Sequence, residues 1–480
     1  MSIEVNIMAA KKRRPVILML YKILFIAAFA VWVIFAFKHL FPLPLSAFVY
    51  DFSPPIPVLY ESYDNYLEHI KKFEESHDAY IEMLKRDGFE GLRFFPHSIK
   101  ITLIDYDAVN ESDAIKNDGK YFYIFSDCPS IKLDDYPHTL FDGSVIIADA
   151  YSADEMDVVS KILLASGKTG VNEKKYTDMY ISGQNLVVLS YEYDLVEYDF
   201  SYGYSPDFHS TVTIVDIYDI TDKNKPVRKR TFELDGNLSG SREQNGVLYL
   251  FTTKSIRWNS GYYIDYTDAP GTTDRDKYIP SYFDSVYGEK QYVPAERLYS
   301  FLPKKIGPEI SILISTINIA AIDLNSNAPA DVSSYIFMDF CIPTLYMGAE
   351  NIYLMDNDRR SVINYTNVTK LGVEKTNIRY VASIKLPGLM RGRFSADEYK
   401  GNLRIATTEG DNRDYLFVLD ENLNFLSAVR NIANGKRTMS VGFDKEMVYV
   451  YTFDPIDTLF TVDLSDPQSP EIKAELEKPG

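Results

Sequence analysis

Six stretches of the chain share one pattern, a turn containing glycine or aspartate followed at once by an aromatic or aliphatic run. The six turns begin at Asp118, Ser182, Asn245, Gly348, Lys400 and Asp444. A short apolar run bounded by turn residues predicts a strand. Because the same unit returns along most of the chain, the sequence predicts an all-β fold made of repeated sheets.

A second repeated unit follows three of these strands. Each copy is another strand that ends in aspartate and a turn containing proline, and the copies cover residues 214–226, 319–329 and 460–470. Short polar side chains bond the nearby backbone in such turns, and proline sets φ. Strands and turns repeated at about blade length are typical of a β-propeller. We therefore predict a propeller with at least six blade repeats over residues 98–480.

Composition agrees with strands and a sizeable core. Hydrophobic residues make up 46% of the 480 residues, and there are 37 tyrosines and 28 phenylalanines. Aromatic side chains favour the half-buried surfaces of pleated sheets.

The interval between Gly246 and Gly348 is longer than the others, which predicts an insertion at 258–299. This segment is rich in aromatic residues but lacks strand periodicity, so we expect a long loop. Aromatic loops can form binding surfaces, and an equally open interpretation is a loop that covers one end of its own sheets. The candidate binding residues are Trp258, Tyr262, Tyr263, Tyr266, Tyr282 and Phe283.

The N-terminal region predicts a membrane anchor. A basic tail at 1–14 precedes an apolar stretch at 15–41 that is long enough to cross a bilayer if Lys22 and Lys38 extend toward the interfaces. The position of the basic cluster Lys11 to Arg14 predicts a cytoplasmic N-terminus and an extracytoplasmic C-terminal part. A cleaved signal peptide, which would make the protein secreted, is the alternative.

Two elements are expected between the anchor and the sheets. Residues 42–61 contain five prolines and predict an extended stalk. Residues 62–88 carry apolar side chains at three- and four-residue intervals, which predicts an amphipathic helix that packs on the β domain. The alternative for this helix is a dimerising or partner-binding coil.

The net charge of the chain limits which partners are expected. The net charge is -18, and because residues 1–38 hold six basic side chains and one acid, the remainder has 44 basic and 67 acidic groups. Such an acidic surface repels phosphate backbones, so nucleic acid is not an expected partner. The expected partners are the lipid bilayer and an extracellular protein or glycan.

Familiar catalytic and metal-binding motifs are missing from the sequence, which contains six histidines and two cysteines. We expect no cofactor and no metal site, and whether the chain is an enzyme stays open. Carboxylates from two blades facing a channel could act as acid and base, and Asp113, Lys116 and Asp118 are one such cluster. Turn contacts and contacts between blades are the other interpretation of these three residues. Cys128 and Cys341 are expected to be free thiols, with a disulfide as the alternative.

Several segments resemble a family of secreted or membrane-anchored bacterial and archaeal β-propeller proteins. The segment VNESDAIKNDGKYFY at 109–123 is similar to the family's opening VDEADIVKTDGKYIY. The other segments are Ser241-Arg242 before a strand, FSADEYKGNLRIATT at 394–408 and VYVYTFDPIDTLFTVDLSDP at 448–467. The family pattern usually continues with further strands beyond a Pro-Gly like Pro479-Gly480. The resemblance implies a propeller without a settled biochemical role.

The sequence thus predicts a membrane-anchored extracytoplasmic propeller that binds or scaffolds a protein or an envelope polymer. The alternative function is an extracellular hydrolase or lyase that acts on polysaccharide or peptide with carboxylate chemistry.

Overall fold

A computed structural model describes most of the β region and part of the N-terminal region. The described ranges are 56–86, 115–130, 140–149, 157–164, 172–194, 211–257, 273–302, 314–338, 343–358, 364–390, 395–410, 413–432, 437–453 and 458–477. All of them lie in one compact unit, Phe52–Lys304 together with Ser311–Gly480.

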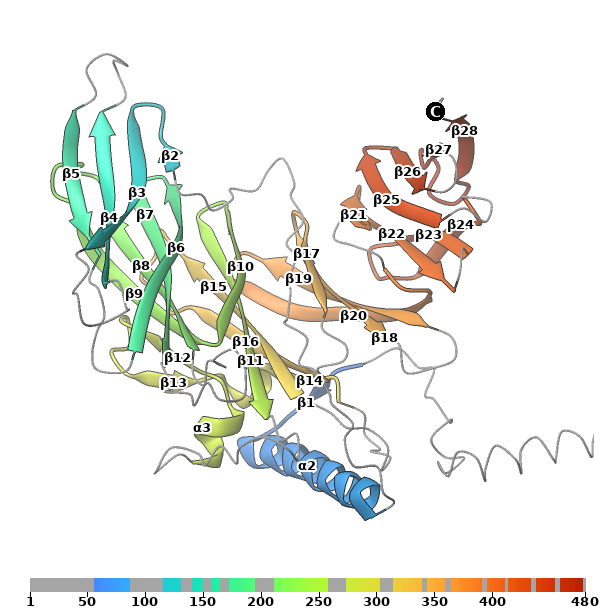
Figure 1. Ribbon diagram of the computed structural model, residues 1–480, viewed down its shortest axis with the longest axis horizontal. Coiled ribbons are helices and arrows are strands. Elements are labelled where there is room, and N and C mark those ends of the chain that lie inside the picture. The colour runs from blue at the N-terminus through green and yellow to red at the C-terminus, as the bar shows by residue number, and fades with distance from the viewer. Residues whose placement is uncertain are drawn as a thin grey trace, which may run out of the picture. The chain divides into compact units, whose positions relative to one another are not determined.

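The described strands form six sheets, and each is built on a four-stranded antiparallel meander in chain order (Figure 1). Sheet 1 contains β2 (Ile115–Asn117), β3 (Tyr121–Ser130), β4 (Leu140–Asp149) and β5 (Val158–Leu163). Sheet 2 is built on β6 (Asn172–Ser182), β7 (Asn185–Asp194), β8 (Thr211–Asp219) and β9 (Val227–Asp235). Sheet 3 is built on β10 (Asn237–Gln244), β11 (Val247–Arg257), β15 (Ile314–Asp323) and β16 (Asp331–Met338).

The remaining sheets have four strands each. Sheet 4 contains β17 (Thr344–Met347), β18 (Asn351–Asp358), β19 (Tyr365–Glu374) and β20 (Asn377–Pro387). Sheet 5 contains β21 (Ala396–Tyr399), β22 (Asn402–Glu409), β23 (Arg413–Leu419) and β24 (Phe425–Arg430). Sheet 6 contains β25 (Arg437–Asp444), β26 (Met447–Phe453), β27 (Thr458–Asp463) and β28 (Glu471–Glu477).

The six turns found in the sequence occupy equivalent places. Each joins the first and second strands of a sheet, just before β3, β7, β11, β18, β22 and β26. Four of them place glycine at positive φ, namely Gly119, Gly183, Gly246 and Gly401. Only glycine adopts this conformation without strain. The prediction of an all-β fold with repeated sheets is therefore confirmed.

The aspartate turns also form as predicted. Strands β8, β15 and β27 end at Asp219, Asp323 and Asp463. The carboxylates accept hydrogen bonds from the backbone two residues further on, at 2.8 to 2.9 Å. A fourth such turn, at Asp420, was not predicted from the sequence. It lacks proline, and the Asp420 carboxylate accepts hydrogen bonds from the backbone N–H groups of Asn422 and Asn424. Its Asp-x-Asn-x-Asn spacing was the available signal.

Apolar clusters join neighbouring sheets. One cluster spans sheets 1 and 2, and others span sheets 3 and 4, sheets 4 and 5, and sheets 5 and 6. Tyrosine supplies much of this core, because Tyr123, Tyr180, Tyr335, Tyr346 and Tyr353 are fully buried. The tyrosine-rich composition therefore reflects contacts between sheets as well as surface.

The insertion has more structure than the sequence suggested. Its described part forms α3 (Asp274–Tyr278), β12 (Ser281–Asp284), β13 (Lys290–Tyr292), η3 (Ala295–Arg297) and β14 (Leu298–Ser300). Strand β12 pairs with β9, which widens sheet 2 to six strands, and β14 pairs with β16 in sheet 3. The expectation of an irregular loop is wrong for this part, because strands of three or four residues are too short to show periodicity.

The N-terminal segment also adds to the β region. Residues Val58–Leu59, within the range predicted as a stalk, form β1 and pair with β14 at the edge of sheet 3. Helix α2 (Tyr63–Arg86) follows. It buries Tyr66, Ile70 and Phe73, and the Tyr66 hydroxyl donates a 3.0 Å hydrogen bond to the Tyr278 carbonyl of α3. The described part of this helix thus packs on the insertion.

Several predictions concern residues outside the described ranges. They include the basic tail at 1–14, the membrane helix at 15–41, most of the stalk, Asp113 and Cys341. Within the described ranges, neither helix combines the length and apolarity that a membrane crossing needs.

Candidate functional site

Two of the six candidate aromatic residues lie in the described part of the insertion. Tyr282 and Phe283 are neighbours on β12, whereas Trp258, Tyr262, Tyr263 and Tyr266 lie outside the described ranges. The role of all six as binding residues stays a prediction.

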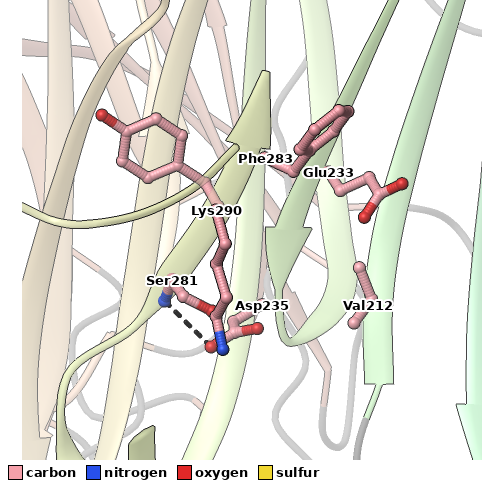
Figure 2. Close-up of a pocket in the computed structure, with 7 residues that line it drawn as sticks. Val212, Glu233, Asp235, Ser281, Phe283 and Lys290 are labelled. Atoms are coloured by element: carbon pink, nitrogen blue, oxygen red, sulfur yellow. Dashed lines mark hydrogen bonds between the residues drawn. The ribbon is translucent and has the colours of Figure 1, made fainter. Parts of the chain in front are cut away.

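Tyr282 and Phe283 belong to a pocket of about 460 Å³ on sheet 2 (Figure 2). The pocket is lined by Val212 of β8, Glu233 and Asp235 of β9, Ser281, Tyr282 and Phe283 of β12, and Lys290 of β13. The insertion therefore supplies four of the seven lining residues, and the repeated sheet supplies the rest.

Strand alternation decides which side chains face the pocket. Phe283 is directly opposite Glu233 on β9 and Lys290 on β13, so the three side chains share one face of the sheet. Tyr282 points to the other face, where its ring lies 5.9 Å from that of Phe232. Figure 2 shows Phe283 and Glu233 next to each other on neighbouring strands. Phe283 is thus the aromatic side chain best placed to contact a ligand.

The same face of sheet 2 packs against sheet 1 further inward. Glu233 pairs with Ile214, and two residues along β8 Asp216 pairs with Val188, a member of the apolar cluster between sheets 1 and 2. That cluster contains no residue of β9, β12 or β13. Among the described residues, the apolar contact between sheets 1 and 2 thus does not extend to the outer strands β9, β12 and β13.

Asp235 is held in place at one end of the pocket. Its Oδ2 accepts hydrogen bonds from the Ser281 backbone at 2.9 Å and from Lys254 Nζ at 3.1 Å. The first bond ties β12 to β9, and the second neutralises the carboxylate.

Glu233 has a different environment. Burial raises the pKa of its carboxyl group, the nearby Glu192 carboxylate raises it further, and Lys174 acts in the opposite direction. A half-buried carboxylate of raised pKa is a feature of functional sites and also of structural networks.

The base of the insertion orients Lys290 at the pocket. Its Nζ lies 3.4 Å from Asp276 Oδ1 in α3. The hydroxyl groups of Thr273 and Tyr292 both donate to Asp276, and these bonds lower the pKa of Asp276. The bond to Asp276 also raises the pKa of Tyr292 to about 12. Lys290 therefore lines the pocket with its charge partly offset by Asp276.

A buried ion pair fixes β12 beneath the pocket. Arg230 of β9 donates from Nε and Nη2 to the two oxygens of Asp284, at 3.0 and 2.5 Å. The two side chains are 4% and 0% exposed. Arg230 also donates to the Ser326 carbonyl of sheet 3, and Asp284 accepts from the Ala330 backbone. One pair thus joins the insertion to two sheets, which sequence spacing does not reveal.

The opening motif lies elsewhere, in sheet 1. Asp118 accepts hydrogen bonds from the backbone of Lys120 and Tyr121 and from the Tyr123 hydroxyl, and Lys223 of sheet 2 lies 3.6 Å from it. Lys116 lies over the Tyr180 ring of sheet 2. These are turn contacts and contacts between sheets, which is one of the two interpretations drawn from the sequence.

Metal ligands do not gather in this region. Among the residues that the structure describes, no group of three or more His, Cys, Asp or Glu side chains is arranged to hold a metal ion.

Consecutive four-stranded meanders, each with the same turn between its first and second strands, are typical of a β-propeller protein. The sequence matches the family model for the Beta propeller domain over residues 102–480. The chain therefore belongs to the Beta propeller domain family.

Two archaeal relatives align with parts of the chain. An uncharacterized protein of Archaeoglobus fulgidus is 31% identical over 166 residues, which cover 30% of this chain and 27% of that protein. An uncharacterized protein of Methanocaldococcus jannaschii is 32% identical over 122 residues, covering 24% and 19%. The matched segments thus span about a quarter and a fifth of the two relatives.

Solved structures show only a distant likeness. BamB from Moraxella catarrhalis has 11% identity and a TM-score of 0.22, with 72% of this chain and 82% of that chain covered. The C-terminal WD40 domain of Sif2 has 8% identity and a TM-score of 0.22, with coverages of 76% and 99%. TM-scores this far below 0.5 support no detailed correspondence.

Proposed function

We propose that this protein is a membrane-anchored, extracytoplasmic binding propeller that holds a protein or an envelope polymer. The observation that carries the proposal is the pocket on sheet 2, where the insertion places Phe283 beside charged groups of the repeated strands. A concave site with one aromatic wall and a few polar groups is typical of ligand recognition. Membership of the chain in the Beta propeller domain family supports the proposal, because propellers offer loops and sheet edges to partners.

Deleting the whole insertion is a poor test of this site. It would remove Asp284 and leave Arg230 buried without a counterion, and it would remove α3 from beneath α2. A point substitution, Phe283→Ala, changes the pocket and leaves these contacts intact.

The binding test compares Phe283→Ala with Phe425→Ala in the full chain. Phe425 is a phenylalanine on β24 of sheet 5 that is 56% exposed, so the control removes the same side chain far from the pocket in sequence. Envelope components captured by the unaltered protein should be lost with Phe283→Ala and retained with Phe425→Ala. Full retention with Phe283→Ala would show that the pocket is not the binding site.

Anchoring rests on the sequence at 15–41 and has its own test. The full chain should resist carbonate extraction from membranes, and a variant lacking residues 1–41 should not. Protease added to intact cells should cleave the β region and spare the N-terminal tail. A mature protein that begins beyond residue 41 in the medium would favour the secreted alternative.

The second candidate is a hydrolase or lyase acting on an extracellular polysaccharide or peptide. The observation that favours it is that Glu233 and Asp235 line one pocket and that burial raises the pKa of Glu233, as a proton donor requires. Turnover of an envelope glycan or peptide by the full chain, lost in Glu233→Gln, would support this candidate. A turnover that Glu233→Gln leaves unchanged would place any activity elsewhere.

A further inference from the structure

Most charged groups around the sheet 2 pocket already have partners. Asp235 is bonded to Lys254, and Lys290 is paired with Asp276. These pairs account for one carboxylate and one ammonium group of the lining. Each of these two charges is therefore partly offset by its partner.

The next charged residues inward form a closed group of their own. Asp216 lies 3.7 Å from Lys174 and 3.5 Å from Arg228, and it accepts a 2.7 Å hydrogen bond from the Thr231 hydroxyl. Lys174, which lowers the pKa of Glu233, is therefore shared with Asp216.

Two carboxylates remain. Among the described residues, neither the Glu233 carboxylate nor the Glu192 carboxylate forms a hydrogen bond or an ion pair. Both lie on the face that carries the pocket, because Glu192 pairs with Val212 and Val212 pairs with Asp235. They are close enough for Glu192 to raise the pKa of Glu233. The pocket and its margin thus hold two carboxylates without a hydrogen bond or ion pair of their own, and the described basic group that acts on Glu233 is Lys174, which also pairs with Asp216.

The wall beside Glu233 is aromatic. Phe283 is directly opposite Glu233 in the β12 to β9 pairing, and it is only partly buried. A cation near an aromatic face is attracted to the ring, and a carboxylate beside the ring adds an ionic hydrogen bond. A planar guanidinium group can use both at once.

We infer that the sheet 2 pocket takes a positively charged side chain, arginine in preference to lysine, from a segment of a protein partner. The guanidinium group lies against Phe283 and donates to Glu233, with Glu192 adding attraction from the margin. A volume of about 460 Å³ accommodates such a side chain. This inference rests on the proposed binding function and chooses a protein over a polymer as the partner.

The test uses the full chain in detergent micelles and two short capped peptides. One is Gly-Ser-Arg-Ser-Gly, and the other carries citrulline, which keeps the shape of arginine without its charge. Calorimetry should show binding about tenfold tighter for the arginine peptide, and a lysine peptide should lie between the two. Equal affinity for the arginine and citrulline peptides would overturn the inference.

Variants then locate the binding. Glu233→Gln should weaken the affinity for the arginine peptide by about tenfold and leave the affinity for the citrulline peptide unchanged. Glu289→Gln removes the same charge at an exposed residue next to β13 and should change neither affinity. Undiminished arginine binding by Glu233→Gln would also overturn the inference. Thermal melting of each variant checks that it is folded.

The peptide experiment and the capture experiment can fail independently of each other. If the arginine peptide does not bind but Phe283→Ala still abolishes capture of envelope components, the chosen ligand class is wrong and the pocket remains the binding site. If capture also survives Phe283→Ala, the proposed function of the pocket fails as well.

Discussion

Sheets 2 and 3 differ from sheets 4, 5 and 6 in what lies at their outer edges. Sheets 4 to 6 are plain four-stranded meanders, whereas sheets 2 and 3 have six strands each. The additional strands come from the insertion and from the segment before α2. The two regions share the same repeated sheet, and only the widened one carries the pocket described above.

The polar contacts of the two regions are partly shared and partly different. From sheet 4 to sheet 6, residues beside the repeated turns make the polar links, as where Glu398 accepts from Asn351 and Glu446 accepts from Lys400. Such a link also joins sheets 2 and 3, where Ser182 donates to Glu243. The widened region additionally holds the buried pair of Arg230 and Asp284, which fixes the added strand β12 to β9. Repeated contacts thus join the sheets of both regions, and the added strand has an anchoring pair of its own.

The largest expected effect is that of Asp284→Ala. It leaves Arg230 buried without its counterion and leaves the Ala330 N–H group without its acceptor, so unfolding free energy should fall by about 3–5 kcal/mol in urea denaturation.

The matched variant is Asp397→Ala in sheet 5. Asp397 pairs with Arg404 on the adjacent strand, and that pair is also buried. Arg404 keeps a hydrogen bond to the Lys445 carbonyl, as Arg230 keeps one to the Ser326 carbonyl, but Asp284→Ala also removes the acceptor of the Ala330 N–H group, so the loss for Asp397→Ala should be smaller. A larger loss for Asp397→Ala would contradict the special importance of the widened region.

The next effect concerns two glycines with positive φ. Gly236 joins sheets 2 and 3 at φ 105°, and an added Cβ would lie 2.6 Å from the Thr253 carbonyl oxygen. Gly236→Ala should therefore lower the free energy of unfolding by about 2–3 kcal/mol. Gly401, in a repeated turn, has open space around it, so Gly401→Ala should cost about 1 kcal/mol. Equal shifts in the melting temperature would reject this distinction.

A smaller effect is expected where α2 meets the insertion. Tyr66→Phe removes the hydrogen bond to Tyr278 and should cost about 1 kcal/mol. Hydrogen exchange should then accelerate in α2 and leave sheets 4 to 6 unchanged. Tyr63→Phe keeps the ring that Arg275 covers at 4.2 Å and serves as the control. Exchange that quickens equally in both variants would argue against a role for the Tyr66 hydroxyl.

The smallest effect depends on pH. The folded protein raises the pKa of Glu233 above its ordinary value of 4.5, so the folded state binds more protons than the unfolded state just above that pH. Stability contributed by this group is present at lower pH and is lost as pH rises through the folded pKa. Glu233→Gln should therefore raise the melting temperature slightly at pH 7 and leave it unchanged near pH 3.

Glu289→Gln removes the same charge at an exposed residue outside the pocket lining and is the control for this comparison. A Glu233→Gln variant that is less stable than the unaltered protein at pH 7 would mean that the ionised carboxylate has a stabilising partner.

Much of the repeated region could be predicted from the sequence because its signals are local. The turn at Asp118-Gly119 and the aspartate at Asp463 determine their own backbone hydrogen bonds within a few residues. The strands of the insertion were harder to predict from the sequence. Strands β12 and β13 contain only four and three residues, and they form because β12 pairs with the edge strand β9 and β13 pairs with β12.

The candidate site shows the same limit. Phe283 was among the predicted aromatic residues, but Glu233, Asp235 and Lys290 were not. No local pattern distinguishes them from other charged residues on strands. Their common position depends on strand register, which places Phe283 opposite both Glu233 and Lys290.

The sequence by itself determined the repeated meanders, their turns and the place of the insertion, because turn chemistry and strand patterning act between near neighbours in the chain. Only the tertiary structure decided that the insertion widens two sheets, that Arg230 and Asp284 meet, and that Glu233 is left beside Phe283. These outcomes depend on pairing between residues about 50 positions apart, for which the chain carries no local signal.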